Sequence, residues 1–288
     1  MNGIYKLIYS EAGIRLIFFF FVISIMAIWE ILRPKRQLIE NKIRRWKKNL
    51  LIIIIDSITL KLVFPVTLVS IAAGAEAAHW GLLNHFEISR PVAFIMGFLA
   101  MDLSIYLQHL MFHAVPILWR LHMVHHADMD IDVTTGLRFH PLEMILSLAI
   151  KMATISAIGP PPLAVLAFEV ALNASSLFNH GNVNIAEKID KYLRLFVVTP
   201  DMHRVHHSVI IRETNSNFGF NFPWWDRIFG TYRAQPIMGH EQITIGLSHI
   251  RYESTLGILG VLALPFTGDQ GPYPINRSGA DPRLLKKS

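Results

Sequence analysis

Long runs of apolar residues fill most of the first 180 positions and predict helices that cross a membrane. About 20 apolar residues suffice for a helix to span the hydrocarbon core of a bilayer. Three runs reach that length, and two shorter ones flank the turn Gly-Pro-Pro-Pro at residues 159–162. We expect four or so spanning helices, with the two shorter runs forming a helical hairpin that dips into the membrane. The five runs are residues 14–32, 50–74, 91–115, 144–158 and 163–177.

The two ends of the chain differ in character. The first run is longer than the apolar core of a signal peptide and lacks a small-residue cleavage site after it, so we expect a retained membrane helix. Residues 255–266 are apolar but too short to span, which predicts a docking or interfacial helix. The polar tail at residues 268–288 is rich in Pro and Gly and is expected to be poorly ordered.

Composition agrees with an all-α integral membrane protein. Of the 288 residues, 52% are hydrophobic and only 17% are charged, which is lean for a soluble enzyme. We predict membrane helices joined by a basic link in residues 1–94. A catalytic region follows in residues 95–235, where a helical, histidine-rich metal domain is expected to cap the membrane helices. Residues 236–288 are predicted to form a cap helix and a flexible tail.

Basic residues crowd the link between the first two apolar runs. By the positive-inside rule this link lies on the cytoplasmic side, so the third run returns there and carries its histidines to the same side. We interpret the link as a solvated topology signal that attracts anionic lipid. It is not expected to bind nucleic acid, because no stacking aromatic residues interleave it. The residues are Arg33, Lys35, Arg36, Lys42, Arg44, Arg45, Lys47 and Lys48.

Three histidine boxes carry the chemistry. Their H-x-x-x-H and H-x-x-H-H spacings place two or three imidazoles on one helical face. Neutral imidazole is the commonest metal ligand in proteins, and the chain has no cysteine, so ligation must use nitrogen and oxygen. Consecutive histidines point about 100° apart on a helix and can serve different ions, so we expect more than one metal. The boxes are His109 with His113, then His122, His125 and His126, then His203, His206 and His207.

Four further residues are candidates for the site. Asp102 lies on one helical stripe with His109, and a charge inside an apolar run is a functional candidate by default. It could orient an imidazole, although a polar residue facing a water-filled gap is the alternative. His140 and His180 are candidate ligands or partners of ligands. Asp226 is a candidate acceptor for a ligand histidine, with packing or capping nearly as plausible. The two carboxylates are the candidate catalytic residues.

Taken together, these motifs resemble the fatty acid hydroxylase/sterol desaturase superfamily of integral-membrane oxygenases. The resemblance covers roughly residues 95–232 and includes R-F-H-P-L-E from Arg138, P-x-x-H-x-x-H-H from Pro200 and W-D-x-x-F-G-T ending at Thr231. It implies a bundle of membrane helices with a cytoplasmic, histidine-lined dimetal site, normally di-iron. The ligands it implies are His109, His113, His122, His125, His126, His180, His203, His206 and His207, with His140 as an addition.

One position departs from the family pattern. Some members have a third H-x-x-x-H box, but here Asn184 stands four residues after His180, which leaves the ligand count around one metal open. The sequence also lacks a recognisable cytochrome b5 module. The resemblance therefore implies a separate electron donor of the ferredoxin or cytochrome b5 type.

The expected function is O2-dependent hydroxylation, or less favourably desaturation, of a lipid. Two iron ions are expected, with zinc as a possible substitute that has no redox chemistry of its own. The substrate could be a sterol, a fatty acyl chain, an alkyl glycerol or an aminolipid. We place the protein in the inner or plasma membrane if bacterial, or in the endoplasmic reticulum if eukaryotic. A metal transporter and a haem electron carrier are the alternatives.

Overall fold

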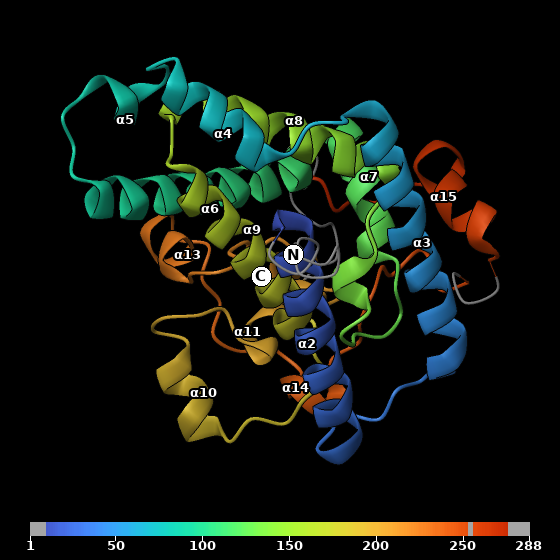
Figure 1. The fold of residues 1–288 in the computed structure, drawn as a ribbon. Coiled ribbons are helices and arrows are strands. Elements are labelled where there is room, and N and C mark those ends of the chain that lie inside the picture. The colour runs from blue at the N-terminus through green and yellow to red at the C-terminus, as the bar shows by residue number, and fades with distance from the viewer. Residues whose placement is uncertain (1–9, 253–255, 276–288) are drawn as a thin grey trace.

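The computed structural model describes residues 10–252 and 256–275, and within them it contains helices and no strand (Figure 1). Five helical segments are long and apolar enough to cross a membrane. This confirms the predicted all-α membrane class. The segments are α2 (Glu11–Leu32), the stretch Lys42–His85 that holds α3 (Lys42–Val63), α4 (Leu68–Ala77) and α5 (Leu82–His85), then α6 (Arg90–Ala114), α8 (Pro141–Ile158) and α9 (Pro162–Asn179).

The second apolar run is not one helix, contrary to the expectation of a single span over residues 50–74. Helix α3 ends at Val63, and α4 starts only at Leu68. Pro65 lies between them, and a proline restricts the residue before it to extended backbone. Phe64 accordingly has φ −130° and ψ 90°. The chain therefore bends, and α4 packs across the hairpin helices α8 and α9.

The predicted hairpin is present, and a histidine stands at each of its open ends. Helix α8 starts after His140, and α9 ends just before His180. Between them Gly159 adopts the left-handed conformation at φ 68°, which glycine tolerates without a steric cost. Helix α6 packs against both hairpin helices. A Cβ placed on Gly97 would lie 2.6 Å from Cβ of Pro160, so only glycine permits this approach.

The apolar faces divide between a buried core and an exposed surface. One core cluster joins α4, α6, α8 and α9 through residues such as Met101, Ile155 and Phe168. By contrast, α2 leaves Phe20 and Phe21 about 60% exposed, as expected for a helix that faces lipid. The packing of α2 on α9 and of α3 on α8 completes the membrane part.

Short helices gather at the histidine end of the bundle. In Figure 1, α10, α11, α13 and α14 lie together on the side away from α4 and α5. A further short helix, α15, docks on α7, as expected for the C-terminal apolar run. The predicted flexible tail falls mostly at residues 276–288, outside the described residues. The bounds are α7 Pro116–His126, η1 Thr135–Leu137, α10 Glu187–Leu193, α11 Pro200–His206, α12 Ile211–Thr214, α13 Trp224–Ile228, α14 Gly239–Gln242 and α15 Ile258–Thr267.

The basic link is not the solvated segment that the sequence predicts, because much of it binds the histidine-rich region. The Arg45 side chain is 1% exposed and donates to both oxygens of Asp128 at 2.9 and 2.8 Å. It also donates to Asp132 at 2.8 Å. Burial alone would raise the pKa of Asp128, but the guanidinium outweighs burial and lowers that pKa. Lys35 pairs with Asp201 at 2.7 Å, so the link and the histidines lie on the same side of the bundle.

Replacement of Arg45 by Met should destabilise the purified protein strongly, because it leaves two buried carboxylates without a cation. Breaking a buried ion pair in this way costs about 3–5 kcal/mol. Thermal unfolding in detergent, followed by loss of the monodisperse elution peak, measures the effect. Arg44→Met is the control, since the neighbouring Arg44 is exposed. Equal unfolding temperatures for the two variants would contradict the assignment of Arg45.

Candidate metal centre

Four segments bring nine histidines together. Helix α6 carries the first box and α7 the second, while α11 and the residue after it carry the third. His180 caps the C-terminus of α9. All nine side chains are buried, with at most 3% of their surface exposed. The histidines whose spacing predicts a shared helical face within each box therefore do meet at one common site.

The nine histidines form two groups. Five belong to one group and four to the other, and within each group the ligand atoms lie within 4.8 Å of one another. The groups adjoin, since the rings of His126 and His207 are only 4.7 Å apart and stacked. The first group is His109, His113, His122, His126 and His206, and the second is His125, His180, His203 and His207.

Nitrogen–nitrogen distances fit metal ligation. The Nε2 atoms of His109 and His122 are 3.1 Å apart, and the same atom of His180 lies 3.1 Å from His125 and 3.0 Å from His203. Two nitrogens each ~2.1 Å from one ion and at right angles to each other would be ~3.0 Å apart. The lone pairs thus converge with the spacing that a bound ion requires.

Hydrogen bonds at Nδ1 orient six of the rings. A proton held on Nδ1 by an acceptor leaves the lone pair of Nε2 free for a metal. Four of the acceptors are backbone carbonyls and two are side chains. The pairs are His109 with Phe218 O (2.8 Å), His113 with Asn215 Oδ1 (3.0 Å), His122 with Glu143 Oε1 (2.6 Å), His125 with Arg138 O (3.1 Å), His180 with Ser176 O (2.6 Å) and His206 with Ser216 O (2.7 Å).

Burial favours the neutral form of an imidazole, which is the form that binds a metal. Burial lowers the pKa of His122 to about 3 and that of His180 to about 4. Burial, followed by neighbouring imidazoles, lowers the pKa of His126 and His207 as well. Several ring nitrogens, including Nε2 of His113, are buried and have no hydrogen-bonding partner among the residues that the structure describes. Because such atoms are costly to leave unsatisfied, the residues fit a pair of metal ions.

Asp102 is not a partner of any described histidine. It accepts hydrogen bonds from Asn221 Nδ2 at 2.9 Å and Trp225 Nε1 at 2.8 Å, and so fastens the segment after the third box to α6. Asp226 accepts from the backbone N–H groups of Phe218 and Gly219 at 2.8 and 2.9 Å. The Phe218 carbonyl accepts a hydrogen bond from His109. Asp226 therefore helps to orient that imidazole indirectly, because it holds the loop that carries the carbonyl.

His140 lies outside both groups of histidines. Its Nδ1 accepts from the backbone N–H of Leu142 at 3.1 Å, which caps the start of α8, and its Nε2 lies 3.1 Å from the carbonyl of Leu262. The ring therefore fixes α8 and α15, and the structure does not bring it to the metal. Asn184, at the missing histidine position, is exposed. The four-histidine group assembles without either residue.

Sequence reasoning missed some partners of the ligands. The motif R-F-H-P-L-E ends at Glu143, for which no partner is predicted, but in the structure its side chain contacts His122. The place of Glu143 in R-F-H-P-L-E, beside the histidine boxes, was the available signal. Nor does the sequence predict a partner for the acids of D-x-D-x-D at residues 128–132, although the alternating charges near a basic link could have indicated one.

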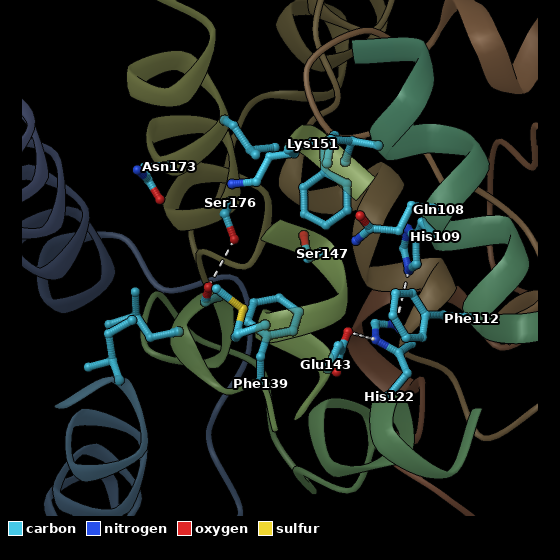
Figure 2. Close-up of a pocket in the computed structure, with 17 residues that line it drawn as sticks. Gln108, His109, Phe112, His122, Phe139, Glu143, Ser147, Lys151, Asn173 and Ser176 are labelled. Carbon is cyan, nitrogen blue, oxygen red and sulfur yellow. Dashed lines mark hydrogen bonds and ion pairs between the residues drawn. The ribbon is translucent and has the colours of Figure 1, made fainter. Parts of the chain in front are cut away.

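A cavity of about 120 Å³ reaches the five-histidine group (Figure 2). Residues of α3, α6, α8 and α9 form its walls, and His109 and His122 lie at its edge. Apolar side chains dominate the lining, among them Ile105, Phe112 and Phe139. An apolar space between membrane helices that ends at the candidate metal centre suits a hydrocarbon chain.

Comparisons with known proteins agree with this arrangement. The model of the family described as fatty acid hydroxylase matches residues 94–231, which contain all nine histidines. An ornithine lipid hydroxylase of Rhizobium tropici is 28% identical over 228 residues, 78% of this chain and 62% of its own length. Human alkylglycerol monooxygenase is 29% identical over 164 residues, 55% of this chain and 34% of its own.

Human cholesterol 25-hydroxylase is also similar, at 28% identity over 186 residues, 61% of this chain and 63% of its own length. The chain thus spans less than two thirds of the length of each of these relatives. No solved structure matches the chain significantly.

Removing a ligand should lower the metal content, and removing His140 should not. We expect His126→Ala and His207→Ala each to lose about one metal ion per chain, because each removes a nitrogen from one group. His140→Ala should keep the wild-type content. Elemental analysis of protein purified from metal-replete cells measures this, and metal loss in His140→Ala would place that ring among the ligands.

Replacing Glu143 should weaken metal binding without abolishing it. Gln at this position loses the carboxylate that holds Nδ1 of His122, and loss of such a partner typically weakens a metal site about 10–100-fold. Chelator competition measures the change, with Glu187→Gln as a control because Glu187 is exposed and far from the boxes in sequence. A metal affinity equal to that of the wild-type protein would show that Glu143 does not support the metal centre.

Proposed function

Because this chain is a member of the fatty acid hydroxylase superfamily, we propose that it is a membrane-bound di-iron oxygenase that hydroxylates a C–H bond of a lipid. The main support is that two features of the structure, the histidine groups and a cavity, lie next to each other. Two groups of buried histidines adjoin each other, and the five-histidine group borders an apolar cavity that opens among membrane helices. The first feature suits redox-active metals, and the second suits a lipid chain.

Iron is proposed from the reaction class. Imidazole ligands alone suit iron, zinc, copper and nickel equally. A pair of iron ions would supply the redox chemistry that activates dioxygen, which zinc does not. One oxygen atom enters the C–H bond and the other leaves as water, with two electrons and two protons taken up from a donor.

The protein's own residues position the reactants. Phe112 and Phe139 line the cavity beside the ligands His109 and His122. The Phe139 ring stacks on His125 at 4.6 Å between centroids, so the ligands on this side are shielded from water. A substrate chain held between these walls would present its carbon to the five-histidine group.

Hydroxylation is favoured over desaturation by the similar proteins, whose names describe hydroxylases and monooxygenases. Their named substrates are an ornithine lipid, alkylglycerol and cholesterol, which share only their lipid nature. We therefore propose a lipid substrate as a class.

The metal centre is proposed to face the cytoplasm. The ion pair between Lys35 and Asp201 ties the basic link to the third histidine box, so both lie on one side of the membrane. The positive-inside rule assigns that side to the cytoplasm. A separate donor protein of the ferredoxin or cytochrome b5 type would deliver electrons there.

The two alternatives fit the geometry less well. A haem carrier needs space for a macrocycle between axial histidines, but the rings of His126 and His207, one from each group, pack at 4.7 Å. A transporter places its ligands near the middle of the bilayer on interrupted helices. Here most of the ligands lie beyond the ends of the spans, on α7 and α11.

Isotope incorporation tests the proposed function. Protein purified after iron-replete expression should contain about two iron ions per chain, and cells exposed to ¹⁸O₂ should accumulate lipid with one labelled oxygen. A double variant, His126→Ala with His207→Ala, is the control and should give unlabelled lipid. Less than one iron per chain, together with no labelled lipid, would overturn the proposal.

A further inference from the structure

Trp119 joins the five-histidine group to a part of the chain that supplies no ligand. It lies in α7, three residues before His122, and its side chain is fully buried. The centroid of its ring system lies 4.8 Å from the ring centroid of His113 and 5.3 Å from that of His126. The indole also stacks on Tyr273, with centroids 5.6 Å apart and planes 19° from parallel. An aromatic stack thus leads away from two of the candidate ligands.

The stack continues to the protein surface. The ring centroid of His249 lies 5.7 Å from that of Tyr273. Its Nε2 lies 2.7 Å from the carbonyl oxygen of Asp269, an exposed residue. A Cβ placed on Gly271 would lie 2.5 Å from Cε1 of His249, so only glycine lets the ring come so close to this loop. Three successive ring contacts therefore connect a candidate metal ligand with the solvent-facing surface.

A chain of hydrogen bonds runs beside the rings. Nδ1 of His113 donates to Oδ1 of Asn215 at 3.0 Å, and Nδ2 of Asn215 donates to the carbonyl oxygen of Tyr273 at 2.8 Å. The candidate ligand and the tyrosine are thus joined twice, through the indole and through one amide. Electrons tunnel more readily through bonds and van der Waals contacts than through gaps. Two connections between the same ends therefore strengthen the electronic coupling between them.

Hydrogen bonds also fix the positions of the two central rings. Nε1 of Trp119 donates to the carbonyl oxygen of Gln270 at 2.9 Å, and the hydroxyl of Tyr273 donates to that of Val209 at 2.9 Å. Both rings are buried, and buried aromatic rings with a bonded polar atom pack in one orientation. The separation between the rings is therefore constant, as efficient tunnelling requires.

The surface around His249 lies on the same side of the bundle as the basic link. Nη1 of Arg36 in that link donates to the carbonyl oxygen of Ile243 at 2.6 Å. The backbone N–H of Gly246 donates to the carbonyl oxygen of His207 at 3.0 Å. The segment that carries His249 is thereby fixed both to the link and to the third histidine box. It faces the compartment in which the donor protein is proposed to act.

A second aromatic chain leaves the centre in another direction. The rings of Phe218 and His113 lie 5.1 Å apart, and Tyr106 contacts Phe218 at 6.4 Å and Phe229 at 5.4 Å. Tyr106 belongs to the spanning helix α6, and Phe229 is 52% exposed beside it. This chain ends next to a membrane helix, where a water-soluble donor protein does not dock. The chain through the indole is therefore the better route for electrons.

We propose that Trp119, Tyr273 and His249 form the route by which electrons reach the five-histidine group from a reduced donor protein, which docks over His249 and Asp269. In each step the donor is oxidised by one electron and a metal ion of the group is reduced by one. No bond forms or breaks. Two such steps supply the two electrons that hydroxylation takes up. The proposal rests on the proposed function for the donor and for the metal.

The route and the cavity contact the five-histidine group through different members. None of the three route residues lines the cavity, which reaches the group at His109 and His122. The indole makes its closest ring contacts with His113 and His126. A donor protein and a lipid chain can thus serve the group at the same time.

Flash-triggered reduction tests the route without turnover. The chain contains no cysteine, so Asp269→Cys allows a ruthenium photosensitiser to be attached at one defined position. After a laser flash the reductively quenched label donates an electron, and the absorbance of the ferric centre gives its reduction rate under argon. Tyr273→Leu should slow this rate about tenfold, an apparent change of ~1.4 kcal/mol in activation free energy. Tyr273→Phe, which keeps the ring and loses only the hydroxyl, should leave the rate unchanged.

A second label position provides the matched control. Lys188 is exposed on α10, and in Figure 1 this helix and α15 lie at opposite edges of the molecule. With the label on Lys188→Cys, Tyr273→Leu should not change the reduction rate. In protein without any change at Tyr273, reduction from position 269 should be faster than reduction from position 188. This last comparison does not require Tyr273→Leu to fold.

The outcomes separate this proposal from the proposed function. No effect of Tyr273→Leu from position 269, or equal slowing from both positions, overturns the route while the oxygenase stands. Slowing only from position 269, with no ¹⁸O-labelled lipid in cells, upholds the route and overturns the oxygenase. If the purified protein holds too little iron, copper(II) takes its place in the same measurement, because imidazole binds copper and the ion accepts one electron.

Discussion

Nine imidazole rings packed within contact distance of one another are the constraint on which the rest of the structure depends. Protonating such a cluster would bury several positive charges together, so the rings stay neutral and each needs a defined tautomer. Six obtain it from acceptors at Nδ1, and four of those acceptors are backbone carbonyls. The paths of the loops are therefore as much a part of the metal centre as the histidines.

Buried charges hold those loops in place. Asp226 binds two successive N–H groups beside Phe218, whose carbonyl orients His109. Arg45 holds Asp128 and Asp132 in the segment between the second box and Arg138. Helix α3, which carries Arg45, thereby contributes to the centre without supplying a ligand. These ion pairs explain why the basic link packs against the histidine-rich region and does not lie in solvent.

In this sequence the lengths of the apolar runs predict the spans and the hairpin, and helical periodicity predicts the faces of the three boxes. The features that the sequence does not predict depend on contacts between residues that lie far apart along the chain. The roles of His140 and Asp102 follow from Leu262 and Trp225, which no local pattern connects to them. Pro65 signals the bend after α3, but the length of the apolar run alone predicts a single span. Arg45 resembled any other topology charge, because its partners lie more than 80 residues away.

The cavity touches only one of the two histidine groups. His109 and His122 line it, whereas no member of the four-histidine group does. A dinuclear centre built on this scaffold is asymmetric, with one half exposed to the lipid and the other enclosed by protein. Its two ions would differ in exchange rate and in spectroscopic signal. Substrate binding would then perturb one ion directly and the other through ring contacts between the groups, such as the stacked rings of His126 and His207.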